Sequence, residues 1–77
     1  MAMYLNKLTP KHKVGDRVSF EMKDGTIEGN IVVVDKGTFE DPYNVYYDIE
    51  GEAPGTNHEI WWFKHIPETD VTLIREI

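Results

Sequence analysis

The sequence predicts an all-β fold, a five-stranded and strongly bent antiparallel sheet with a short 3-10 turn before the last strand. Two observations support this prediction. Apolar and polar residues alternate in several short segments, which is typical of strands with one buried face. Gly, Pro, Asn and Asp separate these segments. No segment shows the apolar period of an amphipathic helix. Because closure removes the exposed edges of a small sheet, we expect a closed or nearly closed barrel.

The first two strands form the clearest predicted hairpin. The segment VGDRV at residues 14–18 is typical of a turn that leads into a strand, and Asp24-Gly25 is a strong hairpin signal. We therefore expect the first strand over residues 14–22. Its predicted buried side chains are Val18, Phe20 and Met22.

The second strand is predicted to follow this turn and to continue as far as Val34. The face that we expect to be buried carries Ile27, Gly29, Ile31 and Val33. Val32 and Val34 place apolar groups on the opposite face, so we expect the middle of this strand to be covered on both sides. A glycine inside a strand marks a bend, a bulge or a close approach of another backbone, and we expect one of these at Gly29.

Three more strands are predicted in the second half of the chain. We expect the third over residues 44–50, the fourth over 58–66 and the fifth over 71–74, with a 3-10 turn over residues 67–70. The side chains predicted to point inward are Val45, Tyr47, Ile49, Trp62, Val71 and Leu73. In the fourth strand this prediction places Trp61 and Phe63 on the outer face.

The length of 77 residues corresponds to one domain, which buries about 60–65% of the surface that the unfolded chain exposes. We expect an N-terminal arm over residues 1–13 and the barrel domain over residues 14–77. Within the arm, Tyr4, Leu5 and Leu8 are the apolar side chains that would cover an edge or a face of the sheet.

Three features of the chain resemble the SH3-like small barrels, including the Tudor and KOW types. They are VGDRV at residues 14–18, the bent second strand over residues 25–34, and the aromatic segment 59–63 with the Ile66-Pro67-Glu68 turn that follows it. The resemblance covers residues 14–77 and implies a barrel that binds other molecules, which for a Tudor-like domain means an aromatic cage for methylated Lys or Arg. Chains of this size and style also resemble small proteins of bacteria and their phages.

The charge of the chain is −6 and is unevenly distributed. Residues 1–23 contain five cationic and two acidic side chains, a charge of +3, whereas residues 24–77 contain three cationic and twelve acidic ones, a charge of −9. An acidic body argues against general nucleic-acid binding, which depends on neutralising phosphates, and differs from the basic KOW-type domains that bind RNA. The cations that leave this alternative open are Lys7, Lys11, Lys13 and Arg17.

Aromatic residues are concentrated in the third and fourth predicted strands and the loop before them. Exposed aromatic side chains often mark an interface, and neighbouring carboxylates such as Asp41 and Glu50 suit a basic partner. The residues predicted to bind a protein or peptide are Phe39, Tyr43, Tyr46, Trp61, Phe63, Asp48 and Glu59. The alternative is a structural role, in which the N-terminal arm covers the same aromatic side chains.

Other functions have less support in the sequence. His58 and His65 lie about 23 Å apart if the fourth strand is extended, so we expect no shared metal ion. We expect no cofactor and no catalytic group, because nucleotide-binding glycine motifs and a serine–histidine–acid arrangement are not evident. Self-association into a larger assembly is the first alternative to peptide binding. The chain has no cysteine and no apolar run of membrane-spanning length, so we expect a cytoplasmic protein.

Overall fold

The strands of the structure follow the predicted chain order and form an antiparallel sheet. The structure is a computed structural model, and it describes residues 9–37 and 43–77. Its elements are β1 (Arg17–Met22), β2 (Gly25–Asp35), β3 (Tyr46–Glu52), β4 (Ile60–Pro67), the 3-10 turn η1 (Glu68–Asp70) and β5 (Thr72–Arg75). The described residues contain no α-helix, so the prediction of an all-β chain with a 3-10 turn before the last strand is confirmed.

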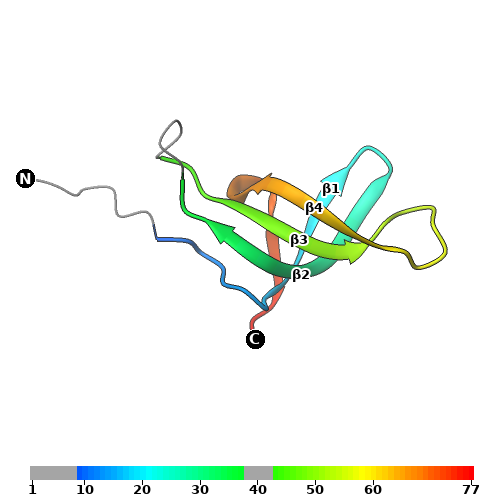
Figure 1. The fold of residues 1–77 in the computed structure, drawn as a ribbon, viewed down its shortest axis with the longest axis horizontal. Helices are drawn as coiled ribbons and strands as arrows, with labels where there is room; N and C mark the ends of the chain where they lie inside the picture. Colours follow the sequence, from blue (N-terminus) through cyan, green and yellow to red (C-terminus); the bar gives the residue numbers. More distant parts are fainter. Residues whose placement is uncertain (1–8, 38–42) are drawn as a thin grey trace, which may run out of the picture.

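The sheet has the order β4-β3-β2-β1-β5 and curls without closing (Figure 1). Within the described residues β4 pairs only with β3, and β5 pairs only with β1. The two strands are therefore the edges of the sheet, and the predicted closed barrel is not confirmed.

Two glycines face each other where β2 and β3 approach closely. Gly29 of β2 pairs with Gly51 of β3. A Cβ atom on Gly51 would lie 2.5 Å from the carbonyl oxygen of Glu28, and one on Gly29 would collide with the carbonyl oxygen of Glu50. The predicted close backbone approach at Gly29 is confirmed, and it involves a second glycine that the sequence did not single out.

A bulge in β2 reverses its buried face. Ile31 pairs with Ile49, but Val33 pairs with Asp48, so β2 contains one extra residue at this point. Because side chains alternate along a strand, the residues after the bulge change faces. Val34 packs against the core and Val33 is exposed, so the prediction that Val33 points inward is wrong.

A second bulge lies in β4 and affects its aromatic residues. Tyr47 pairs with Ile66 and Ile49 pairs with Phe63, which leaves an extra residue in β4, and His65 has a φ of 62°. Phe63 is 8% exposed and its ring meets the Phe20 ring edge to face, with the centroids 5.4 Å apart. The prediction that Phe63 points outward and Trp62 inward is therefore wrong.

The core lies on the concave side of the sheet and follows the predicted alternation elsewhere. Its buried side chains are Val18, Phe20, Ile27, Ile31, Val45, Tyr47, Ile49, Ala53 and Phe63. Val71 is half-buried against this core, as predicted. Met22 is exposed at the end of β1, so the prediction that it is buried is wrong. Leu73 pairs with the buried Val18 and therefore lies on the core face as predicted, although it is 38% exposed.

Two carboxylates fix the segments that flank the strands. Asp16 is 2% exposed and accepts hydrogen bonds from the backbone N–H groups of Lys13, at 3.1 Å, and Ile77, at 3.2 Å. The Glu68 carboxylate accepts a hydrogen bond from the Tyr47 hydroxyl, with 2.5 Å between the oxygens. It also accepts the backbone N–H of Lys11 at 2.8 Å, which attaches the segment over residues 9–13 to η1. Tyr4, Leu5 and Leu8 lie outside the described residues.

Candidate functional site

The structure divides the predicted binding residues between several places. Phe39 and the neighbouring Asp41 lie outside the described residues. Phe63 belongs to the core and is not accessible to a partner. The remaining residues lie around β3, β4 and the segment before β3. They are Tyr43, Tyr46, Asp48, Glu59 and Trp61.

The outer face of β3 carries a row of carboxylates. Tyr47, Ile49 and Gly51 are buried, so the alternate residues between and beyond them point to the opposite side. These alternate residues are Asp48, Glu50 and Glu52. The sequence predicted a binding role for Asp48 and named Glu50 among the neighbouring carboxylates, and the alternation with buried residues adds Glu52.

Trp62 lies next to this row on the outer face of β4. It pairs with Glu50 across the two strands, and its side chain is 52% exposed. The indole N–H of Trp62 donates a hydrogen bond to Oδ2 of Asp48 at 2.9 Å. Trp62 is thus an exposed aromatic side chain with a fixed orientation, and the sequence prediction missed it because it assigned this residue to the core.

Asp48 also holds the bulge of β4 in place. Its Oδ1 atom accepts the backbone N–H of His65 at 3.0 Å. The imidazole of His65 stacks on the ring of Tyr46, with centroids 3.8 Å apart and an angle of 12° between the planes. Asp48 therefore positions the Trp62 indole and the His65 backbone, and both of its oxygens are already hydrogen-bonded.

Trp61 projects from the opposite side of β4 to Trp62. Its ring lies 6.1 Å from the ring of Phe63, and its indole N–H donates to Oε1 of Glu59 at 3.0 Å. Trp61 is 49% exposed, so it forms the solvent-facing end of the core. The predicted residues Trp61 and Glu59 are brought together, but on a different face from Tyr46 and Asp48.

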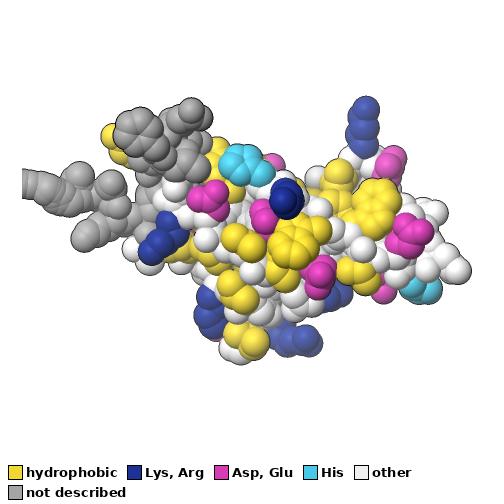
Figure 2. All heavy atoms as spheres, in the orientation of Figure 1, with side chains coloured by type: hydrophobic (Ala, Val, Ile, Leu, Met, Phe, Trp, Pro, Cys, Tyr) yellow, Lys and Arg dark blue, Asp and Glu magenta, His cyan; other side chains and the backbone are white. Residues whose placement is uncertain are grey.

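The charge of the outer face is not balanced within the described residues. The Oε1 atom of Glu52 is 3.3 Å from Nδ1 of His58, whereas the exposed Glu50 carboxylate has no hydrogen-bond or ion-pair partner in residues 9–37 and 43–77. Figure 2 shows hydrophobic side chains interleaved with acidic ones across this side of the molecule, with Lys or Arg side chains among them. An exposed indole beside a carboxylate that has no partner in the described residues suits a cation on an apolar stem, such as a Lys or Arg side chain.

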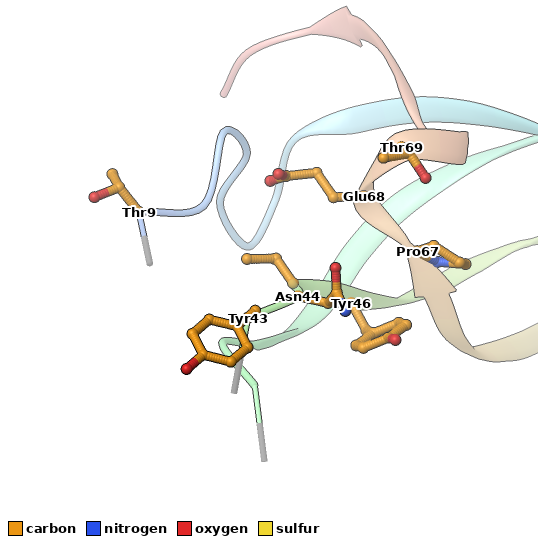
Figure 3. A pocket seen from close by; sticks show the side chains of 8 residues that line it. Thr9, Tyr43, Asn44, Tyr46, Pro67, Glu68 and Thr69 are labelled. Atoms are coloured by element: carbon orange, nitrogen blue, oxygen red, sulfur yellow. The ribbon is translucent and has the colours of Figure 1, made fainter. Parts of the chain in front are cut away.

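A pocket of about 230 Å³ lies at the other end of β3 (Figure 3). It is lined by Thr9, Tyr43, Asn44, Val45, Tyr46, Pro67, Glu68 and Thr69. The rings of Tyr43 and Tyr46 lie apart and do not face each other, and the Glu68 side chain points toward residues 9–13. The aromatic cage that the Tudor resemblance implies is therefore not assembled from Tyr43 and Tyr46.

Comparison of the chain with protein-family models, curated proteins and solved structures gives no match. In the part of the chain that the structure describes, no helix is long and apolar enough to cross a membrane. In the same residues, no three His, Asp or Glu side chains converge as metal ligands. Function must therefore be argued from the surface itself.

Proposed function

We propose that this chain is a non-catalytic binding module for a protein or peptide of basic character. The outer face of β3 and β4 is the proposed binding surface. The observation that carries the proposal is the half-exposed Trp62, which lies beside the exposed carboxylate of Glu50 and is oriented by Asp48. Tryptophan residues frequently dominate the binding energy of an interface, and the surrounding carboxylates provide selectivity for cations.

The geometry favours binding because the side chain of Trp62 is already ordered. Immobilising a flexible interface side chain costs about 0.5–1.5 kcal/mol, and the hydrogen bond to Asp48 reduces this cost for the indole. A cation above an exposed aromatic ring contributes about 0.5–1 kcal/mol, and more where water is excluded. Several such contacts are needed for useful affinity, which points to a segment with more than one basic residue.

The test is a titration of the isotope-labelled chain with hexalysine, followed by NMR. We expect chemical-shift changes at the Trp62 indole N–H and at the amides of Glu50 and Glu52. We also expect Trp62→Ala to weaken binding about tenfold, as for an interface anchor. Unchanged affinity in Trp62→Ala, or shift changes confined to other surfaces, would show that this face is not the binding site.

We also propose that the sheet is an incompletely closed member of the SH3-like barrels. The order β4-β3-β2-β1-β5, the long β2 with its close approach at Gly29, and the turn η1 between β4 and β5 support this assignment. Nuclear Overhauser contacts between β4 and β5 test it. Contacts between backbone protons of the two strands would support a barrel, and their absence would leave an open sheet.

Self-association is the second candidate function. β4 is an edge of the sheet, and it begins with the exposed side chains Ile60, Trp61 and Trp62. Sedimentation over a concentration series tests this alternative, because the average mass of a self-associating chain rises with concentration.

Nucleic-acid association is less favoured by the positions of the basic residues. Lys13 Nζ lies 3.2 Å from Oδ1 of Asp16, and Arg17 donates to Oδ1 of Asn30 at 2.9 Å. Lys7 lies outside the described residues. Binding to nucleic acid that weakens steeply with salt would restore this alternative.

A further inference from the structure

We propose that the basic partner binds as an additional β-strand along the open edge of β4. The proposed occupant is an extended segment in which Lys or Arg alternates with apolar residues. This inference rests on the proposed function and specifies its binding mode. Backbone hydrogen bonds would provide affinity, and alternate side chains would provide specificity, as in other cases of strand addition.

The first half of the β4 edge lacks the features that usually protect an edge strand, whereas Lys64, the bulge at His65 and Pro67 lie in its second half. Natural edges are typically short or carry Lys, Pro or inward-pointing charges. β4 instead begins with three consecutive apolar side chains that are about half exposed: Ile60 at 58%, Trp61 at 49% and Trp62 at 52%. β5, the other edge, is only four residues long. An exposed apolar edge of this kind is a template for pairing with another chain.

Two irregular residues limit the length of the available edge. His58 and His65 have φ values of 65° and 62°, which extended strands do not adopt. The regular backbone between them covers residues 59–64. The bulge at His65 interrupts further pairing, so the site accommodates a strand of about six residues.

The outer face of β4 favours basic side chains on the added strand. Neighbouring strands lie about 4.8 Å apart, so outward residues of the added strand would lie beside Ile60 and Trp62, and β3 would be about 10 Å away. The stem of Lys or Arg covers much of this distance along the Trp62 ring and directs its cation toward Glu50. Glu50 is the most available carboxylate, because Asp48 holds two donors and Glu52 lies next to His58.

The inner side of β4 favours apolar side chains at the positions in between. Trp61 projects from this side and is in contact with the buried Phe63. An apolar residue next to Trp61 would extend the core and remove the exposed part of the indole from water. The two faces of β4 thus predict an alternating pattern in the partner. A second copy of this chain fits less well, because it would bring together two molecules of charge −6.

The test uses the full chain and a fluorescent hexapeptide of alternating Lys and Val. Two further peptides carry N-methyl groups either on all Lys or on all Val amides, which removes the backbone donors of one strand edge and keeps the charge. Only one edge of the peptide pairs with β4. We therefore expect one methylated peptide to bind at least about tenfold more weakly and the other to retain most of its affinity.

The outcomes separate this inference from the proposed function. Equal binding of all three peptides, or binding of hexalysine without binding of the Lys-Val peptide, would exclude strand addition and leave the proposed function intact. Failure of every basic peptide would contradict both. A chain that dimerises through β4, with peptide unable to compete, would show that a second copy occupies the edge.

Variants of the chain provide a second readout. Glu50→Gln is expected to weaken Lys-Val binding about two- to fivefold, as for one exposed ion pair. The matched control Glu76→Gln removes the same charge just after β5, at the other edge of the sheet, and is expected to have no effect. In the complex, hydrogen exchange should slow at amides of residues 60–64. Equal effects of the two variants, with no protection in β4, would contradict the inference.

Discussion

Phe63 and Trp62 are adjacent in β4, but the two faces of the strand give them different roles. Phe63 is 8% exposed and packs against Phe20, whereas Trp62 is 52% exposed and is held by Asp48. The carboxylates differ in the same way. Asp16 is buried and surrounded by donors, whereas Glu50 is exposed beside Trp62. The comparison teaches that burial and existing partners, rather than residue type, distinguish groups that maintain the fold from groups available to a ligand.

The largest expected effect separates the two aromatic residues of β4. Phe63→Ala should lower the free energy of unfolding by about 3–5 kcal/mol, because it leaves a cavity beside Phe20. Trp62→Ala should cost about 1 kcal/mol or less, since it removes an exposed side chain and one hydrogen bond. Urea denaturation measures both values. Similar losses in the two variants would contradict the face assignment of β4.

The second prediction concerns the pH dependence provided by Asp16. Burial alone would raise the pKa of its carboxyl, but the N–H groups of Lys13 and Ile77 and the Lys13 ammonium outweigh burial and lower the pKa. A pKa that is lower in the folded state stabilises the fold above the unfolded pKa, and this contribution is lost as the pH falls through the folded value.

Asp16→Asn should therefore lower the melting temperature at pH 7, and its difference from the unmodified chain should shrink as the pH falls below about 4. Thermal melts between pH 7 and pH 3 measure this effect. Glu50→Gln is the matched control, because Glu50 is exposed and should leave the melting curves unchanged. A difference that stays constant with pH would show that the charge of Asp16 does not stabilise the fold.

A smaller effect is expected from the Tyr47 hydroxyl. It accepts the backbone N–H of His12 at 3.2 Å and donates to Glu68, so Tyr47→Phe should cost about 1–2 kcal/mol. Tyr43→Phe, at a residue that is 78% exposed, should cost almost nothing. Equal stability of the two variants would show that the contact between residues 9–13 and η1 contributes little.

The same hydroxyl predicts a loss of stability in alkaline solution. Burial raises the pKa of Tyr47 above its usual range, and the hydrogen bond to Glu68 is the second largest cause of this rise. A raised pKa stabilises the fold below the unfolded value, and the contribution is lost as the pH rises above about 10. Denaturation at pH 9 and pH 11 should show a smaller difference between the unmodified chain and Tyr47→Phe at the higher pH.

The sequence predicted the strands more accurately than it predicted their faces. Alternation in β1 and β3 identified Val18, Phe20, Tyr47 and Ile49 as buried, because polar residues separate them. In β4 both faces carry aromatic or aliphatic residues, so alternation alone does not show which one is buried. The bulges in β2 and β4 leave no mark in a single sequence, and each reverses the faces beyond it. Val33 was misassigned for this reason.

The candidate site was predicted in part for the same reasons. Asp48 was identified as a binding residue because it lies among aromatic residues, and the structure shows that it instead orients Trp62. These two residues are 14 positions apart, and their contact depends on the register of β3 with β4. Alternation along β3 predicts that its carboxylates lie on the outer face. The outward position of Trp62 could not be predicted in this way, because it depends on Phe63 being in the core.

The facing glycines Gly29 and Gly51 have a consequence for how the strands find their partners. Sliding β3 by two residues along β2 would place Ile27 or Ile31 opposite Gly51 and bring a branched side chain into the space of a backbone carbonyl. Compared with the alignments shifted by two residues, the native one alone places glycine on both sides of the close approach. The glycine pair therefore disfavours the alignments of β2 with β3 that are shifted by two residues. These pairing errors are disfavoured because the native positions have no side chains, and not because the native alignment adds contacts.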